Sequence, residues 1–271
     1  MPAAELSRLR VQINHLISLF DDPAAFNAAL RDLLELYSNR AYRAGEAIKP
    51  QPLLPSYRVP PLVMRQLEQE LGKTCQEKPE QALKVVEILW QDLNLEPRLL
   101  ATKLLGAIPP GHEKSVIEVI KRWAQPNENF RILDALFQDG TAGLRKSAPD
   151  LLIQMIETWM SSSRSEIQSI GIRALIPLIQ EPGFENLPPI FRMLNPLVQT
   201  TPPALNADLQ AVMEVLSRRS PTESAFFLRQ ALSLSTGLAT ARLVRRCLPY
   251  FNPEQQSSLR SALQIATPKK R

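Results

Sequence analysis

The sequence predicts an all-α protein, and three observations lead to that prediction. Apolar residues recur at helical spacing along most of the chain, and no segment gives a convincing run of the alternation typical of a strand. The 271 residues include 24 prolines and only 9 glycines, a balance that suits many short helices whose first turns begin at proline. Aromatic residues make up 6% of the chain, which disfavours a β-sandwich or barrel.

The segment Pro79–Trp90 illustrates the helical pattern. Four of its apolar residues, Ala82, Val85, Val86 and Leu89, stand at positions i, i+3, i+4 and i+7 and therefore share one helix face. Its leading proline suits a first helical turn, where the missing N–H has no intrahelical partner. The segment is therefore expected to form an amphipathic helix that buries this face.

The same reasoning gives the remaining elements in chain order. The first helices are expected at Glu5–Phe20 and Pro23–Arg43, and the proline-rich stretch Ile48–Pro61 after them is expected to be extended. Further helices are expected at Val59–Gly72, Pro79–Trp90, Glu96–Ile108, His112–Ala124, Phe130–Phe137, Pro149–Trp159, Ile167–Ile179, Phe184–Val198, Asn206–Arg218, Thr222–Leu234, Thr236–Leu248 and Pro253–Ile265. Pro177 is expected to kink or end its helix.

Short helices in succession cannot each bury an apolar face alone, and pairs of about 35–40 residues are typical of stacked helical repeats. The sequence thus predicts an α-solenoid of stacked antiparallel helix pairs, a HEAT-like or armadillo-type superhelix, with a single-layer helical bundle as the alternative. Residues 1–57 are expected to form an N-terminal helical pair with a proline-rich loop. Residues 58–266 would form the repeat array, and residues 267–271 a basic tail.

Charge is distributed unevenly along the chain. The net charge is +5, yet residues 211–271 alone hold ten basic and three acidic residues, a net charge of +7. Arg242, Arg245 and Arg246 fall on one helix face, and Arg218 and Arg219 end a helix, where cations complement the helix dipole. A basic region on a near-neutral body indicates a polyanion such as nucleic acid as partner, with solubility as the alternative explanation.

Metal, cofactor and thiol chemistry find little support. The two histidines, His15 and His112, and the two cysteines, Cys75 and Cys247, lie far apart and match no metal-ligand spacing, so no cofactor or metal is expected. So few cysteines favour a reducing compartment, the cytoplasm. No stretch of about 18 apolar residues predicts a transmembrane helix, and no membrane partner is expected.

One carboxylate stands out. Asp134 follows Phe130 by four residues, so the two side chains share a helix face one turn apart. An acidic group beside an aromatic ring on a concave surface suits a cationic ligand. The alternative is a solvated residue that pairs with Arg131 or another neighbour. The three tryptophans, at 90, 123 and 159, lie in apolar stripes and are expected to pack in the core.

Three stretches together resemble the bacterial DNA alkylation-repair glycosylases of the AlkD-like, HEAT-like repeat family. Ala82–Leu105 matches a helix pair of that family through Trp90, Glu96, Arg98 and Ala101. Residues 130–174 resemble the family's active-site repeat and the repeat after it, and residues 208–246 resemble its closing helices. The resemblance spans about residues 58–250 and rests on helix order and spacing.

The resemblance implies a function. Members of the family hold duplex DNA in a concave face and release positively charged N3- or N7-alkylated purines. It implies that Asp134 is the catalytic carboxylate and Phe130 its aromatic partner, as a carboxylate would stabilise an oxocarbenium-like sugar. The residues expected to contact DNA are Arg173, Arg218, Arg219, Arg242, Arg245 and Arg246.

This sequence also departs from the family's pattern. Phe130 stands where the family usually has tryptophan, Glu214 falls at the position of a second aromatic, and a cleft arginine falls near Ser169, with Arg173 one turn further on. Three functions therefore stay open: a glycosylase that uses Asp134, a DNA-binding solenoid without catalysis, and a scaffold that binds another protein on its concave face.

Overall fold

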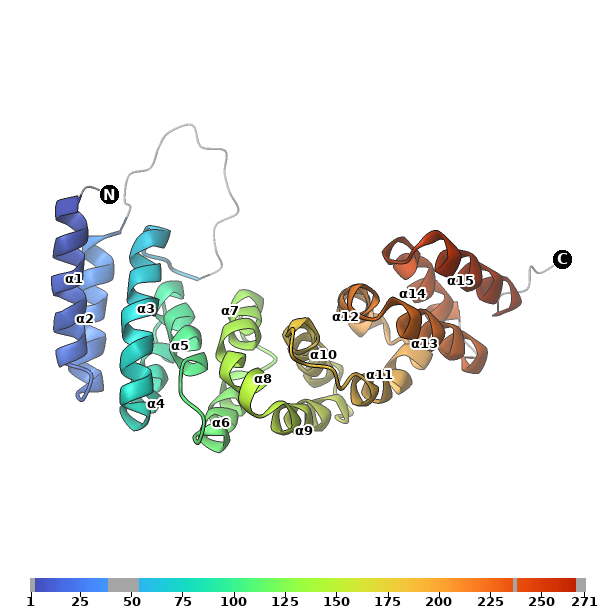
Figure 1. Cartoon of the computed structure of the whole chain (residues 1–271), viewed down its shortest axis with the longest axis horizontal. Coiled ribbons are helices and arrows are strands. Elements are labelled where there is room, and N and C mark those ends of the chain that lie inside the picture. The colour runs from blue at the N-terminus through green and yellow to red at the C-terminus, as the bar shows by residue number, and fades with distance from the viewer. Residues whose placement is uncertain (1–2, 39–53, 236–237, 267–271) are drawn as a thin grey trace. The chain divides into compact units, whose positions relative to one another are not determined.

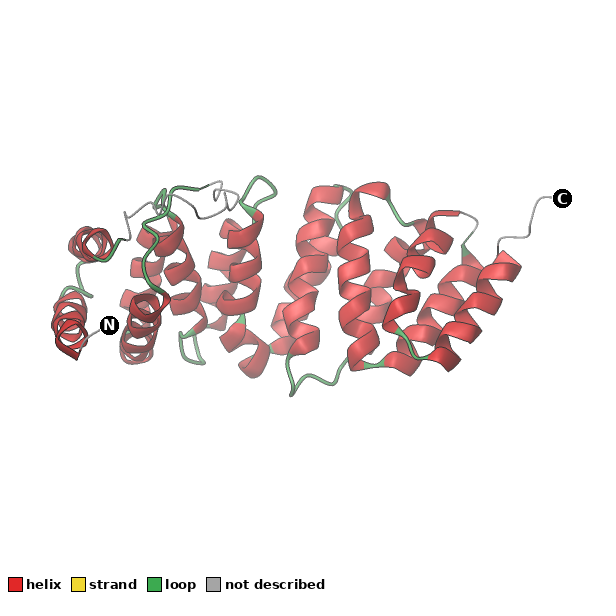
Figure 2. Cartoon of the chain, turned by 90° about the horizontal axis from the view of Figure 1, so that it is seen from above, coloured by secondary structure: helices red, strands yellow, loops and turns green. Residues whose placement is uncertain are grey.

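The structure is a computed structural model that describes residues 3–38, 54–235 and 238–266. All regular elements in these ranges are helices, as Figure 2 shows, so the prediction of an all-α protein is confirmed. The chain divides into two compact units, Met1–Ser147 and Ala148–Arg271. In the part that is described, no helix combines the length and the apolar character needed to span a membrane.

The first unit contains two rows of helices (Figure 1). In one row α1 packs on α3, α3 on α5, and α5 on both α7 and the π-helical turn η1; in the other α2 packs on α4 and α4 on α6. The elements are α1 (Ala3–Ser18), α2 (Pro23–Leu36), α3 (Pro61–Glu77), α4 (Pro79–Trp90), α5 (Leu95–Gly106), α6 (Glu113–Trp123), α7 (Phe130–Ala135), η1 (Leu136–Gly140) and α8 (Ala142–Ser147). Each row thus buries apolar side chains against the other.

The second unit repeats this two-row packing. One row joins α10 to α12 and α12 to α14, and the other joins α9, α11, α13 and α15. Its elements are α9 (Pro149–Met160), α10 (Ser165–Gln180), α11 (Pro188–Thr200), η2 (Pro203–Leu205), α12 (Asn206–Arg219), α13 (Pro221–Leu234), α14 (Leu238–Cys247), η3 (Leu248–Tyr250) and α15 (Pro253–Ala266). Every arginine that the sequence predicts to contact DNA lies in the row formed by α10, α12 and α14.

The core follows the apolar spacing of the sequence. In α4 the four residues predicted to share one face, Ala82, Val85, Val86 and Leu89, are all fully buried. Prolines stand in the first turn of α2, α3, α4, α9, α11 and α13, where their fixed φ suits a helix start. Pro177 does not end α10, which continues to Gln180.

A buried carboxylate fixes the segment that precedes α3. Glu96, near the start of α5, accepts hydrogen bonds from the Ser56 hydroxyl at 2.6 Å and from the backbone N–H groups of Tyr57 and Arg58 at 3.0 and 2.7 Å. Residues 54–60 contain no helix, but Arg58 has a φ of 56°, in the left-handed region, so this part of the predicted extended stretch is not extended throughout. Residues 48–53 of that stretch and the predicted basic tail, 267–271, lie outside the described residues.

Candidate functional site

Phe130 and Asp134 both lie on α7, and both side chains are exposed. Phe130 keeps 59% of its surface open to solvent, and Asp134 is exposed one turn further along the helix. The helix begins where the side-chain oxygen of Asn129 accepts a hydrogen bond from the backbone N–H of Arg131 at 2.9 Å. The expected pairing of an aromatic and a carboxylate on one short helix is therefore present at the surface of the first unit.

A stack of aromatic and charged groups holds the start of α7. The indoles of Trp90 and Trp123 are parallel, with centroids 4.1 Å apart, and the Arg98 guanidinium lies 4.4 Å from the Trp90 ring centroid. Arg98 forms an ion pair with Glu128, whose other oxygen accepts from the backbone N–H of Asn129 at 2.7 Å. The stack thereby fixes the residue that caps α7.

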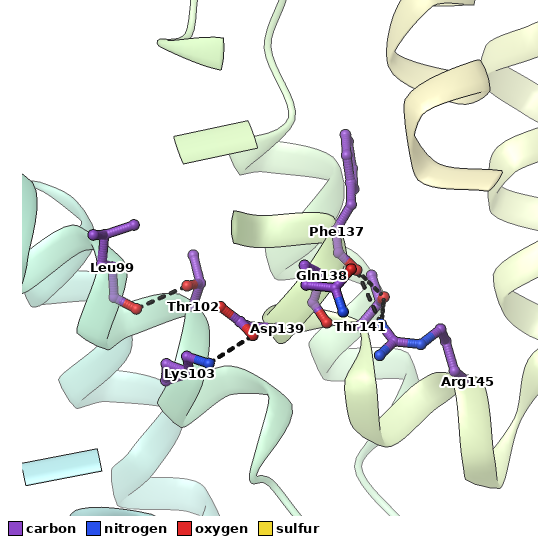
Figure 3. Close-up of polar contacts among 8 residues, drawn as sticks. All are labelled: Leu99, Thr102, Lys103, Phe137, Gln138, Asp139, Thr141 and Arg145. Carbon is purple, nitrogen blue, oxygen red and sulfur yellow. Dashed lines mark hydrogen bonds and ion pairs between the residues drawn. The ribbon is translucent and has the colours of Figure 1, made fainter. Parts of the chain in front are cut away.

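Helix α7 ends at Ala135, and the π-helical turn η1 follows at once from Leu136. Figure 3 shows the polar contacts of this turn. Buried Arg145 donates from one terminal nitrogen to the carbonyl oxygens of Phe137 at 3.0 Å and Gln138 at 2.9 Å, and to the Thr141 hydroxyl oxygen at 2.8 Å. The Thr141 hydroxyl also donates to Phe137 O at 2.5 Å. A π turn disrupts the usual i to i−4 ladder, and these donors satisfy its carbonyls.

Helix α5 holds the same turn from the other side. The Lys103 ammonium pairs with the Asp139 carboxylate at 2.8 Å (Figure 3), and Gly106 lies against the backbone of Asp139 so closely that no β-carbon fits between them. Both ends of the six-residue helix α7 are thus fixed by contacts from outside it. Such anchoring gives Phe130 and Asp134 a defined place on the surface.

In the second unit, Arg173 of α10 and Asp208 of α12 form an ion pair. Arg173 Nε lies 3.1 Å from Asp208 Oδ1, and the Ser169 hydroxyl donates to Asp208 Oδ2 at 2.6 Å. The carboxylate therefore bridges Ser169, near which the family resemblance places a cleft arginine, and Arg173 one turn further on. The side chains of Arg173 and Asp208 are 30% and 13% exposed, so the ion pair is partly buried and still reached by solvent.

The remaining arginines differ in their surroundings. Arg242, Arg245 and Arg246 are exposed on α14, while Ala241, Leu243, Val244 and Cys247 of the same helix are buried, so the predicted shared face is present. Arg218 pairs with Glu214 one turn earlier, at 2.5 Å.

Arg219 has a structural contact within the unit. Its guanidinium donates to the carbonyl oxygens of Pro182 at 3.1 Å and Phe184 at 2.8 Å, in the loop before α11. The contact ties α12 to that loop.

The two cysteines and the metal-binding residue types give no ready site among the residues described. Burial raises the pKa of Cys75 and of Cys247 to about 12, so neither thiol is a ready nucleophile. No group of three or more histidine, cysteine, aspartate or glutamate residues in the described ranges lies where it could hold a metal ion.

Comparison with known protein families shows to which family the chain belongs. Residues 54–246, which include all the candidate site residues, match the family model described as DNA alkylation repair enzyme. The chain belongs to the DNA alkylation repair enzyme family. Neither the curated proteins nor the solved structures gave a significant match. Membership of the DNA alkylation repair enzyme family supports a role in DNA alkylation repair and points to DNA as the partner.

Sequence reasoning missed several residues that shape this site. Asp208, Arg145 and Glu128 were not singled out, because their roles depend on neighbours 4 to 39 positions away in the chain. Arg98 belongs to the motif that carries the family resemblance, and its ion pair with Glu128 gives that motif a structural role. A buried arginine cannot be recognised from local spacing alone.

Proposed function

We propose that this member of the DNA alkylation repair enzyme family binds duplex DNA and hydrolyses the N-glycosidic bond of cationic N3- or N7-alkylated purines. The observation that supports this most is on α7, where the exposed carboxylate of Asp134 and the exposed ring of Phe130 lie one turn apart. The helix is held at both ends by Arg98 with Glu128 and by Arg145. These contacts anchor the backbone that carries Asp134, and a carboxylate held near the sugar would stabilise its developing positive charge.

The reaction we propose follows from the charge on the alkylated base. The bond between purine N9 and sugar C1′ breaks, and its electron pair leaves with the base, which becomes neutral. The sugar develops positive charge that the Asp134 carboxylate stabilises. Water adds to C1′ and gives up a proton to Asp134 or to solvent. The leaving base needs no protonation, because the alkylated purine already carries a positive charge.

DNA contact is proposed for the row of α10, α12 and α14. The exposed arginines of α14 and the positive charge of the C-terminal quarter suit phosphate binding without base readout. Arg173, Arg218 and Arg219 remain proposed contacts, although each also has a partner within the protein. Replacing Arg242, Arg245 and Arg246 by glutamate is expected to abolish duplex binding.

The two-row packing within each unit supports a HEAT-like, armadillo-type stack of helix pairs as the architecture that presents these residues. We retain residues 58–266 as the extent of the array, preceded by the helical pair of residues 1–57 and followed by the tail of residues 267–271. A cytoplasmic location likewise stays a prediction.

A single-turnover assay tests the proposal. Wild-type protein in excess over a duplex with one N7-methylguanine is expected to release the free base, measured by chromatography. Asp134→Asn should reduce the rate on the order of 10²–10³-fold and leave duplex affinity intact. Asp150→Asn, at an exposed aspartate of α9, is the matched control and should behave as wild type. Release that survives Asp134→Asn would show that another group acts.

The second candidate function is DNA binding without catalysis. It is favoured by Glu214, which brings negative charge to a position where the family resemblance places an aromatic, and which pairs with Arg218. Duplex binding by the wild type, without release above spontaneous depurination, is its expected result. A wild type that does not bind duplex even at low salt would favour the protein-binding scaffold instead.

A further inference from the structure

We infer that Asp208 restrains the binding of DNA by competing with phosphate for Arg173. This inference rests on the proposed duplex binding and names a residue that sets its strength. The Asp208 carboxylate joins α10 to α12 through Arg173 and Ser169, within the helix row that carries the exposed arginines of α14.

The Asp208 carboxylate is held in place and is largely buried beside Arg173. One oxygen lies 3.1 Å from Arg173 Nε, and the other accepts the Ser169 hydroxyl at 2.6 Å, so both oxygens are engaged. Only 13% of the Asp208 side chain is exposed, and water therefore screens its charge less than at an open surface. A phosphate that approaches Arg173 meets a fixed negative charge beside the guanidinium.

The consequence for affinity follows from charge. Arg173 with Asp208 is a neutral pair, and the guanidinium contributes little attraction to a polyanion while the carboxylate stays in place. Asparagine at position 208 has the same shape and keeps an oxygen that accepts from Ser169 or Arg173. It removes the negative charge. Arg173 would then neutralise one more phosphate. The attraction of this site for DNA would grow, because the charge of Asp208 no longer cancels that of Arg173.

Salt dependence separates this effect from a general gain of charge. Each phosphate neutralised adds about 0.9 to the magnitude of the slope of log K against log salt concentration. Full-length wild type and Asp208→Asn are compared by fluorescence anisotropy on a short labelled duplex of arbitrary sequence, over a salt series. Asp208→Asn should bind about 3- to 10-fold more tightly at low salt, with a slope steeper by about 0.9.

Two matched variants complete the design. Asp150→Asn changes the net charge by the same amount at an exposed position on α9, outside the row of α10, α12 and α14, and should leave the slope unchanged. Arg173→Gln combined with Asp208→Asn should lose the gain, because the added contact requires Arg173. Should Asp208→Asn fail to fold by circular dichroism, the double variant alone decides. It replaces a neutral pair by two neutral amides, so it should bind duplex as the wild type does, whereas weaker binding would show that Arg173 contacts phosphate despite Asp208.

Several results would overturn the inference. Equal binding of Asp208→Asn and Asp150→Asn would show only a general charge effect. A gain that survives loss of Arg173 would place the effect elsewhere. Weaker binding by Asp208→Asn would mean that the carboxylate supports the arginine rather than competing with DNA. A wild type that does not bind duplex would instead refute the proposed function itself.

Discussion

A β-carbon placed on Gly106 would lie 1.9 Å from the carbonyl oxygen of Asp139, so only glycine lets α5 pack this closely on the π-helical turn. Because the obstacle is backbone and cannot rotate away, Gly106→Ala is expected to lower the free energy of unfolding by about 3 kcal/mol. Chemical denaturation measures this. Gly183→Ala is the control, since nothing lies within 4 Å of its added carbon. Equal stability of the two variants would contradict the packing described here.

Arg145 supplies the donors that the π-helical turn requires. Arg145→Met keeps most of the apolar stem but removes the guanidinium donor from the buried carbonyl of Phe137, the partly buried carbonyl of Gln138 and the Thr141 hydroxyl. We expect a loss of about 3 kcal/mol in unfolding free energy and faster hydrogen exchange across residues 136–141. The exposed neighbour gives the control, and Lys146→Met should change neither quantity.

The pair of Arg98 and Glu128 gives a third prediction. Their side chains are only 11% and 16% exposed, so removing one partner leaves a poorly solvated charge. Arg98→Met is expected to cost about 3–5 kcal/mol. Arg98→Met combined with Glu128→Leu should recover much of that loss, because no uncompensated charge remains. A double-mutant cycle in urea measures the coupling, and additive losses would argue against the ion pair.

Stability of the first unit should depend on pH through Asp92, which is 4% exposed. Burial alone would raise the pKa of Asp92, but hydrogen bonds from Asn94 and Arg31 outweigh it and hold the pKa below its ordinary 3.8. A lowered folded pKa contributes stability above the unfolded pKa, and that stability is lost as pH falls through the folded pKa.

Melting temperatures of the wild type and Asp92→Asn test this dependence. Asp92→Asn is expected to be less stable than the wild type at pH 7, and the difference should shrink below pH 3.8. Asp32→Asn, at an exposed aspartate of α2, should match the wild type throughout. A difference that stays constant with pH would point to lost packing instead of lost charge.

The two cysteines give a fifth prediction. Both are fully buried, Cys75 in α3 of the first unit and Cys247 in α14 of the second. Native protein at pH 7 is expected to react with iodoacetamide only after local or global unfolding, while urea-unfolded protein should react at both thiols within minutes. Mass spectrometry of the peptides measures each site. Rapid labelling of native protein would show that its segment opens readily.

Local pattern was enough to predict the helices, because apolar spacing in segments such as α4 directly reflects the face that is buried. Local pattern failed where contacts with residues elsewhere in the chain determine the backbone conformation. Residues 136–140 read as a continuation of the helix from Phe130, yet they form a π turn because Arg145 and Gly106 hold it from outside.

The candidate site shows the same division between local pattern and distant contact. The shared face of Arg242, Arg245 and Arg246 follows from spacing along one helix, and all three are exposed. Arg219 was predicted to contact DNA from charge alone, and its bonds to the carbonyls of residues 182 and 184 cross from α12 to a preceding loop. Such contacts depend on tertiary packing, which spacing does not encode.

Burial of the two thiols has a consequence for chemical modification of the protein itself. Alkylating electrophiles attack a cysteine through its thiolate, and burial raises the pKa of Cys75 and of Cys247 to about 12, so far less thiolate is present at pH 7 than at an exposed cysteine. An ordinary cysteine presents a few per cent thiolate. A chain whose family acts in DNA alkylation repair thus shields its own sulfhydryl groups from the reagents that damage the genome, and exposure to those reagents should leave its cysteines unmodified while it is folded.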